Sequence, residues 1–155
     1  MVITAGPQPI EVRVAAIEPS RTRQAGDPLF AVVLEEIGGT RRMSVVMRKP
    51  ETDSIAMHLQ SMATARPMTY SFVAGLIHAL GGRLIEGRIT RFDGQTIYAS
   101  AVVSGSQGTQ VLDARPSDII NLALRVGAPI RVEPAVLEAM QTTHSQGEPP
   151  GIEWA

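Results

Sequence analysis

The sequence predicts a single α+β domain in which three or four helices pack against a mostly antiparallel sheet. Segments with strand-like alternation form two groups, one over residues 10–47 and one over residues 84–113. Segments with helical spacing of apolar residues stand between and after these groups, and such segregation is typical of α+β folds. A chain of 155 residues has the usual length of one domain.

The first group of strands is predicted to form a hairpin preceded by one more strand. Apolar residues alternate with Glu11 and Arg13 at the start of the group. Residues 18–28 are polar and contain proline and glycine, so we expect a loop there. The pair Gly38-Gly39 suits a tight turn that needs positive φ. The expected strands cover residues 10–16, 29–37 and 41–47.

Two helices are predicted between the strand groups. Pro50 suits the first position of a helix, because its missing N–H would have no partner there. Thr69 is a good N-cap for the next helix, which should end at Gly81-Gly82. The stripe expected to face the core of this second helix consists of Phe72, Leu76, Ile77 and Leu80.

The second strand group is predicted to be a meander that leads into the last helices. Asp93-Gly94 is a strong hairpin turn, and Pro116 and Gly127 bound a third helix. The expected strands cover residues 84–92, 95–103, 109–113 and 129–132, with a last short helix over 134–140. The folded domain is therefore predicted to span residues 10–140, between loose tails over 1–9 and 141–155.

Composition excludes several classes of protein. The chain has no cysteine, which excludes disulfide scaffolds, thiolate metal sites and cysteine nucleophiles. The net charge is −1, so nucleic acid would have to bind at a local patch rather than through a global positive field. No apolar run is long enough for a membrane span and no signal peptide is visible, so we expect a cytoplasmic protein.

Methionine and histidine give little indication of a site. The three histidines match no metal-ligand spacing, and the two on predicted helices, His58 and His78, are expected on polar faces. Methionine is a flexible gap filler, so we expect a group of five methionines to belong to the core. This group consists of Met43, Met47, Met57, Met62 and Met68.

Polar residues concentrate at three predicted helix starts, over residues 49–53, 66–71 and 113–118. Helix N-termini bind phosphate through free N–H groups and a partial positive charge. Carboxylates beside such a phosphate can hold Mg²⁺ or another divalent cation and cut a phosphodiester bond. The predicted catalytic and metal-binding residues are Glu51, Asp113 and Asp118, and the predicted substrate-binding residues are Arg66, Thr69, Arg115 and Ser117.

The same residues also have a purely structural interpretation. Asp118 stands near the third position of its helix, where a carboxylate caps the helix and complements its dipole. Glu51 stands one residue after Pro50 and can do the same, while Asp113 and Arg115 can form a local ion pair. Spacing alone leaves both interpretations open.

The chain resembles the bifunctional nuclease domain family over about residues 12–140. The most specific stretch is the run D-A-R-P-S-D at 113–118, continued by an apolar helix through Arg125. Further matches lie at 51–56, in the R-P-M-T of 66–69, and in the hairpin around Asp93-Gly94. The resemblance implies an α+β domain that degrades DNA and RNA, with nucleic acid as substrate.

The chain departs from the family pattern at two positions that bear on catalysis. Where the family has His-Asp after its R-P-L-T run, this chain has Tyr70-Ser71, and residues 45–48 also differ from the family's I-W-I-G. A His-Asp pair would supply a general base and its orienter, or a pair of metal ligands. Tyrosine is a poor base at neutral pH, and Ser71 cannot replace a carboxylate as a ligand of a hard cation. The alternatives to an enzyme are therefore a binding or regulatory module and an oligomeric scaffold. A homodimer or higher homo-oligomer would use apolar residues of the first hairpin, namely Val32, Val45 and Met47.

Overall fold

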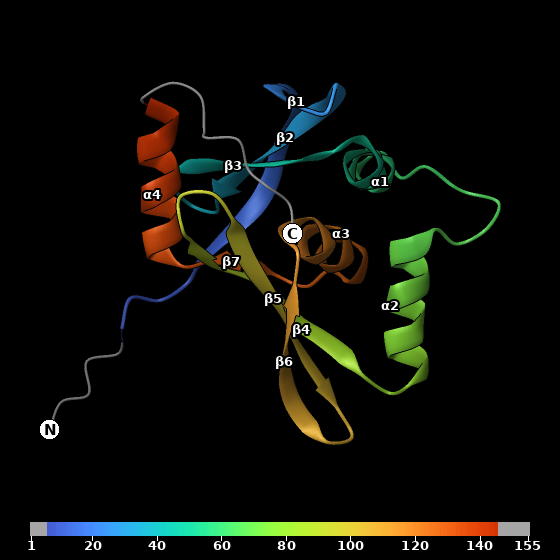
Figure 1. Ribbon diagram of the computed structural model, residues 1–155. Helices are drawn as coiled ribbons and strands as arrows, with labels where there is room; N and C mark the ends of the chain where they lie inside the picture. Colours follow the sequence, from blue (N-terminus) through green and yellow to red (C-terminus); the bar gives the residue numbers. More distant parts are fainter. Residues whose placement is uncertain (1–5, 146–155) are drawn as a thin grey trace, which may run out of the picture.

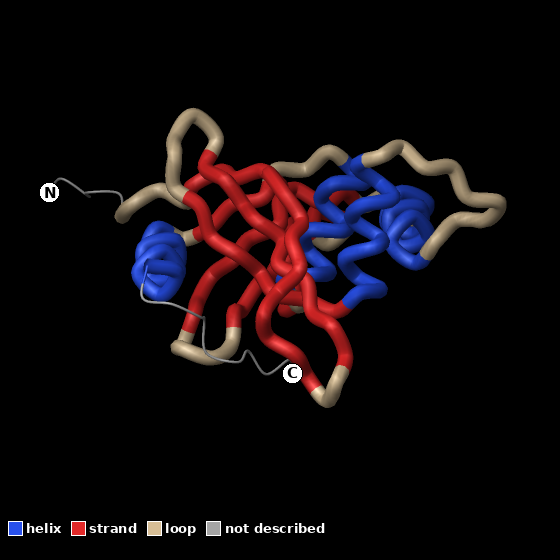
Figure 2. The backbone as a smooth tube through the Cα atoms, turned by 90° about the horizontal axis from the view of Figure 1, so that it is seen from above, coloured by secondary structure: helices blue, strands red, loops and turns tan. Residues whose placement is uncertain are grey.

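Seven strands form one mixed sheet with helices on both of its faces (Figures 1 and 2). The computed structural model describes residues 6–145. The strands are β1 (Ile10–Gln24), β2 (Asp27–Glu36), β3 (Arg42–Arg48), β4 (Arg83–Phe92), β5 (Ile97–Gly105), β6 (Gly108–Ala114) and β7 (Ile130–Val132). The helices are α1 (Lys49–Leu59), α2 (Thr69–Ala79), α3 (Pro116–Val126) and α4 (Pro134–Ser145).

The strand order is β3-β2-β1-β7-β4-β5-β6, and every neighbouring pair is antiparallel except β4 and β7. The short strand β7 joins the two strand groups, because it pairs with β1 on one side and with β4 on the other. The predicted α+β fold with a mostly antiparallel sheet is confirmed. Among the described residues, none of the helices has the length and apolar character of a transmembrane helix.

The loop predicted over residues 18–28 is wrong, because β1 and β2 continue through it as one long hairpin. Their pairing runs to Gln24 and Asp27, with irregularities after Val14 and after Pro19. Beyond Val12, β1 has β2 as its only partner strand, so the missing N–H of Pro19 costs no bond on the other edge. Proline is therefore tolerated in this part of β1, and the strand continues past it.

The predicted bounds of the domain change at its carboxyl end. Helix α4 continues to Ser145 rather than ending at Met140, so part of the tail predicted over 141–155 is helical. Residues 6–9 carry no regular structure, and the remaining parts of the predicted tails lie outside the described residues.

The helices divide between the two faces of the sheet. Figure 2 shows α1, α2 and α3 on one side of the strands and α4 on the other. Helix α3 is the central one, and its Ile119 and Ile120 are fully buried in the core. An added Cβ at Gly87 in β4 would lie 2.0 Å from Cγ2 of Ile119, so this glycine lets α3 lie directly on the sheet.

Helix α2 is the least buried helix, contrary to the stripe predicted from its sequence. None of its residues is fully buried. Phe72 and Leu76 in the helix are 62% and 47% exposed, and Leu80, directly after it, is 77% exposed. Ile77 is the member of that stripe that packs partly against the core. Helical spacing identified an apolar face here, but most of that face is left exposed within the described residues.

The apolar residues predicted for an oligomer interface lie in the core rather than on the surface. Val32 and Val45 are completely buried and Met47 is 1% exposed, so the first hairpin offers no apolar surface through them. Alternation along β2 and β3 could not distinguish a face turned to the core from a face turned to a partner. Large exposed apolar side chains lie instead on α2 and on the edge strand β6.

The close contact of β4 with α3 gives a test of the fold. The variant Gly87→Ala should lower the free energy of unfolding by about 1–3 kcal/mol, because the stiff side chain of buried Ile119 must move. The variant Gly75→Ala, in exposed α2 with open space around its Cβ position, should instead raise it by up to about 1 kcal/mol. Urea unfolding measures both, and equal effects of the same sign would contradict this packing.

Candidate functional site

The first turns of α1, α2 and α3 meet at one place, on the face of the sheet opposite α4. Helix α1 follows β3 directly and α3 follows β6 after the single residue Arg115, so the sheet fixes where both helices begin. None of the three helices has a side chain bonded to its N-terminal N–H groups. Three uncapped, partly positive helix ends therefore lie near one another, which favours an anion there.

Asp118 is the centre of this junction. Its carboxylate accepts two bonds from Arg115, at 2.9 Å from Nε to Oδ2 and 2.9 Å from Nη2 to Oδ1. The hydroxyl of Tyr70 donates to Oδ1 at 2.8 Å. Burial acts to raise the pKa of Asp118, but the bonds from Arg115 and Tyr70 outweigh it and hold that pKa below its usual value. Asp118 is thus an ionised, fully engaged carboxylate.

Tyr70 occupies the position where the family pattern has histidine, and it acts as a donor. Burial and the bond to Asp118 both raise the pKa of its hydroxyl well above the usual value. The hydroxyl therefore stays protonated at neutral pH and cannot serve as a general base. Its bond joins the first turn of α2 to the first turn of α3.

Glu51 adds a second carboxylate on the other side of Arg115. Its Oε1 lies 3.5 Å from Nη1 of Arg115, while its Oε2 is buried and has no hydrogen-bond partner within the described residues. The Oγ of Ser117 is likewise buried without a partner among those residues. Asn121 fixes this part of the junction by donating to the backbone oxygens of Glu51 and Ser117, at 3.1 and 3.0 Å.

Arg125 extends the junction along α3. Its guanidinium donates to the backbone and side-chain oxygens of Ser54 and Asn121 and to Oγ of Ser71, over distances of 2.9–3.2 Å. Its carbon Cζ stands 5.6 Å from the centre of the Tyr70 ring. Burial lowers the pKa of Arg125.

Sequence reasoning did not assign Asn121, Arg125 or Ser54 to the site. A usable pattern was present, since Ser117, Asn121 and Arg125 recur every four residues and so share one side of α3. That side faces α1 and α2 and carries the polar contacts between the three helices.

The structure does not bring Asp113 to the junction. The position of Gly87 in β4 faces Ile119 of α3. Gly87 pairs with Ala101 in β5, and Ala101 pairs with Leu112 in β6. Paired residues share a face and neighbours alternate, so Leu112 faces the α3 layer and Asp113 faces the opposite side. The local ion pair of Arg115 is accordingly with Asp118 rather than with Asp113.

Two further predicted substrate-binding residues stand at the edge of the junction. Arg66 lies in the α1–α2 connection and Thr69 is the first residue of α2, and both are exposed.

Met68, rather than Thr69, occupies the N-cap position of α2, so the predicted cap by Thr69 is wrong. Asp118 also makes no capping bond, because its carboxylate is turned to Arg115 and Tyr70.

The predicted Mg²⁺ site does not fit the side chains found here. Within residues 6–145 there is no group of three or more His, Asp or Glu placed to hold a metal ion. Glu51 and Asp118 are separated by Arg115, which pairs with both. A hard cation between them would have to displace this guanidinium, so no step below is assigned to a metal.

Comparison with known proteins identifies the family of this chain. The family model of the bifunctional nuclease domain matches residues 32–145. The chain belongs to the bifunctional nuclease domain family. An uncharacterized protein of Mycobacterium tuberculosis is 36% identical over 127 residues, which are 82% of this chain and 73% of that protein. The proteins named Bifunctional nuclease 1 of Oryza sativa subsp. japonica and Bifunctional nuclease of Oryza minuta are each 27% identical over 128 residues, or 77% of this chain and 39% of theirs.

The matched part of the bifunctional nuclease domain contains the whole junction. Helices α1, α2 and α3 all lie within residues 32–145, whereas all of β1 and the first residues of β2 lie before this range. Membership of the family therefore concerns the part of the chain that builds the site.

The lowered pKa of Asp118 predicts a pH-dependent stability. A carboxylate with a lowered folded-state pKa contributes stability above its unfolded value of about 3.9 and loses that contribution as pH falls through its folded value. The difference in unfolding free energy between wild type and Asp118→Asn should therefore be full above about pH 5 and shrink at lower pH. Urea unfolding between pH 3 and pH 7 measures it, and a difference that grows toward pH 3 would contradict this account.

Proposed function

We propose that this chain hydrolyses phosphodiester bonds of DNA, RNA or both at the junction of α1, α2 and α3. The observation that carries this proposal is the meeting of three uncapped helix starts around Arg115 and a buried, unpartnered oxygen of Glu51. Family membership and the names of the rice relatives support the same class of substrate.

In this proposal Arg115 binds the scissile phosphate. Asp118 uses its Nε and one N–H of Nη2, and Glu51 Oε1 lies 3.5 Å from its Nη1, which leaves the second N–H of Nη2 and one N–H of Nη1 for phosphate oxygens. The side chain of Arg115 is 44% exposed, so a phosphate can reach it from solvent. Guanidinium suits this role because it pairs with phosphate oxygens in a fixed planar geometry.

Glu51 would act as the general base. Its carboxylate, whose side chain is 17% exposed, takes a proton from a water molecule, and that water attacks the phosphorus while the bond from phosphorus to the leaving oxygen breaks. The leaving oxygen takes its proton from solvent. Asp118 and Tyr70 do not react in this scheme, because they hold Arg115 in position through the three bonds to the carboxylate of Asp118.

The second candidate is a binding or regulatory module that no longer cleaves. The observation in its favour is Tyr70, whose protonated hydroxyl cannot replace the base that the family's histidine would provide. Such a module would hold nucleic acid or another anionic partner at the same junction. Cleavage and binding must therefore be measured on the same protein.

A cleavage assay on supercoiled plasmid and on end-labelled RNA tests the first candidate. The variants Arg115→Ala and Glu51→Gln should each lower the rate roughly 10²–10³-fold, the usual loss when a group that stabilises or activates the transition state is removed. Asp113→Asn, on the other face of the sheet, is the matched control and should cleave like wild type.

All proteins should be purified in parallel, because a contaminating nuclease would give equal cleavage in every preparation. Each is assayed both with Mg²⁺ and with excess chelator, so that the dependence of cleavage on metal is measured as well. Equal cleavage by wild type, Arg115→Ala and Glu51→Gln would contradict this mechanism. Binding of the RNA by wild type without any cleavage would favour the second candidate.

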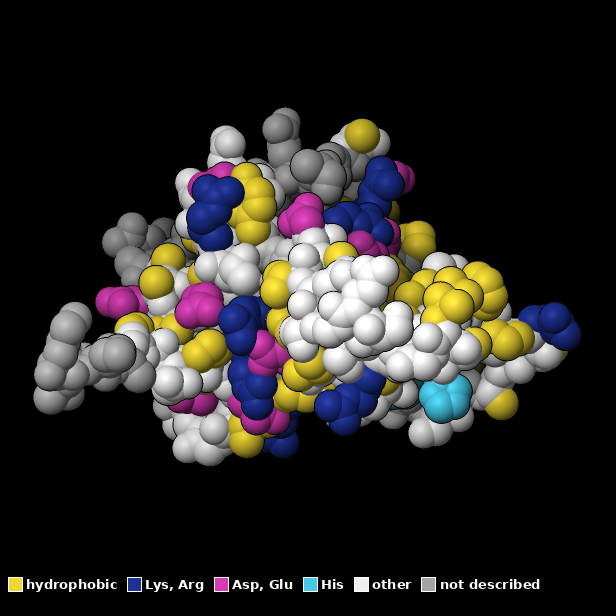
Figure 3. All heavy atoms as spheres, turned by 90° about the horizontal axis from the view of Figure 1, so that it is seen from below, with side chains coloured by type: hydrophobic (Ala, Val, Ile, Leu, Met, Phe, Trp, Pro, Cys, Tyr) yellow, Lys and Arg dark blue, Asp and Glu magenta, His cyan; other side chains and the backbone are white. Residues whose placement is uncertain are grey.

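Self-association is part of the proposal, with α2 in place of the first hairpin. Helix α2 has no Asp, Glu, Lys or Arg, and Figure 3 shows hydrophobic side chains gathered over the end of the molecule where it lies. An uncharged apolar face does not attract nucleic acid, whereas a second copy can cover it through the same face under two-fold symmetry.

Light scattering on a sizing column tests this part. Wild type should have the mass of a homodimer or larger homo-oligomer, and Leu76→Asp should shift it toward the monomer by placing a charge in the apolar face. Gln107→Asp, in the exposed turn after β5, is the control that should not change the mass. A wild-type monomer at high concentration would contradict self-association.

A further inference from the structure

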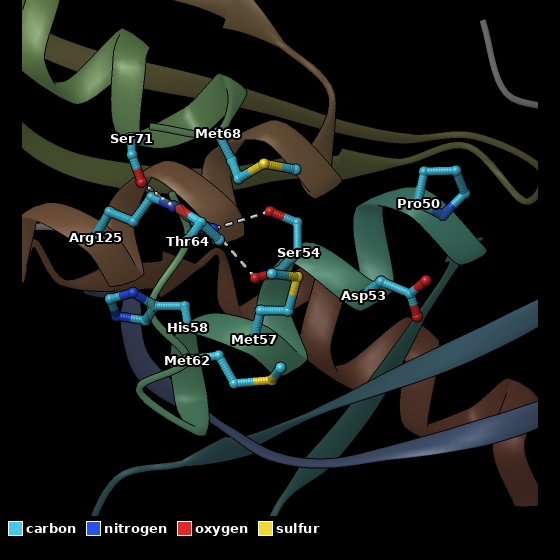
Figure 4. Close-up of a pocket in the computed structure, with 10 residues that line it drawn as sticks. All are labelled: Pro50, Asp53, Ser54, Met57, His58, Met62, Thr64, Met68, Ser71 and Arg125. Carbon is cyan, nitrogen blue, oxygen red and sulfur yellow. Dashed lines mark hydrogen bonds between the residues drawn. The ribbon is translucent and has the colours of Figure 1, made fainter. Parts of the chain in front are cut away.

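A cavity of roughly 330 Å³ opens beside the junction, between α1, the connection to α2, and the ends of α2 and α3 (Figure 4). Its size is at the small end of the range of small-molecule sites, about 300–1,000 Å³. Neither the catalytic scheme nor the sequence assigned it a role. The lining residues used below are Ser54, Met57, His58, Met62, Ser71 and Arg125.

Arg125 gives one wall of this cavity an uncompensated positive charge. Its five hydrogen bonds all go to neutral oxygens, those of Ser54, Ser71 and Asn121. Within residues 6–145 Arg125 forms no ion pair with a carboxylate. The acidic lining residue Asp53 is paired with Lys49 at 2.6 Å. A charged group held this way favours an anionic ligand.

The two serines beside Arg125 add donors for that anion. Ser54 and Ser71 accept the guanidinium bonds through Oγ, at 2.9 and 3.2 Å, so their own O–H protons point elsewhere. The close-up shows both hydroxyls at the same side of the cavity as Arg125 (Figure 4). Charge and free hydroxyl donors together are the elements of a phosphate site.

Three methionines form another part of the cavity wall. Met57, Met62 and Met68 line the cavity, and Met62 and Met68 are 54% and 50% exposed. The expectation that all five methionines fill the core is therefore right for Met43 and Met47 and wrong for the other three. Thioether side chains adapt their shape and contact aromatic rings favourably, so this wall suits a flat ring.

We propose that this cavity binds a single nucleotide of the substrate, with its phosphate bonded by the hydroxyls of Ser54 and Ser71 beside the charge of Arg125 and its base against the methionines. Arg125 stands against the ring of Tyr70, and Tyr70 bonds Asp118, so the cavity is one side chain away from the proposed site of cleavage. The inference rests on the proposed function, because it makes this nucleotide a neighbour of the scissile phosphate.

A cavity for one base selects among nucleic acids. A base inside a duplex is stacked and paired, and taking it out costs a few kcal/mol, whereas a single strand offers its bases freely. The chain should therefore prefer single-stranded substrates and frayed ends. His58 and Thr64, which also line the cavity, supply polar groups that can bond the edge of the base.

Calorimetric titration of the full-length protein with the four nucleoside 5′-monophosphates tests the cavity directly. We expect at least one of them to bind, and the matching nucleoside and inorganic phosphate each to bind at least roughly tenfold more weakly, because each lacks half of the contacts. Met62→Asp should weaken nucleotide binding roughly tenfold by placing a charge in the apolar part of the lining that would hold the base. Leu80→Asp introduces the same charge on an exposed apolar residue outside the cavity and should bind like wild type.

Three results would overturn the proposal: no binding of any nucleotide, equal binding by Met62→Asp and Leu80→Asp, or equally tight binding of inorganic phosphate alone. Its failure differs from failure of the proposed function. Nucleotide binding without cleavage of plasmid or RNA would remove the hydrolase and leave the cavity. Cleavage with wild-type preference for single strands in Met62→Asp would remove the cavity and leave the hydrolase.

Discussion

The carboxylate of Asp118 is the interaction on which the candidate site depends. It accepts two bonds from Arg115, at the start of its own helix, and one from Tyr70, at the start of α2. Arg115 in turn reaches Glu51 of α1. One ionised group thus joins the first turns of three helices, and two of these helices are placed by the strands that precede them. The partly positive helix ends and the guanidinium stay together because this carboxylate offsets their charge.

The structural and the functional interpretation of these residues describe the same contacts. The structural interpretation expected Asp118 to cap its helix and Arg115 to pair with Asp113, whereas Asp118 forms the ion pair with Arg115 and caps no N–H group. The same pair orients the guanidinium of Arg115, which keeps N–H groups for a phosphate. Replacement of the family's histidine by Tyr70 removes a base and adds a donor to Asp118, so Glu51 becomes the group on which catalysis would rest.

The sequence predicted the parts of the fold that depend on local chemistry. Pro50 and Pro116 begin helices within a residue of the expected positions, and Asp93-Gly94 turns between two strands. It could not predict what depends on the neighbouring strand or layer. Pro19 is tolerated because β1 has only one partner strand there, and Asp113 turns away because of its place in the pleat. The four-residue spacing places Arg125 on the polar side of α3, but its contacts with Ser71 and Ser54 span more than 50 residues of chain, so this spacing does not say which helices that side faces.

A carbon-detected NMR titration of the Asp118 carboxyl group tests the central claim most directly. The account predicts that this pKa lies below the ordinary value of an aspartate in wild type, and that it rises in Tyr70→Phe, which removes one donor but keeps the ring. A pKa at or above the ordinary value in wild type, or one that Tyr70→Phe leaves unchanged, would show that Asp118 does not hold the three helices together in this way.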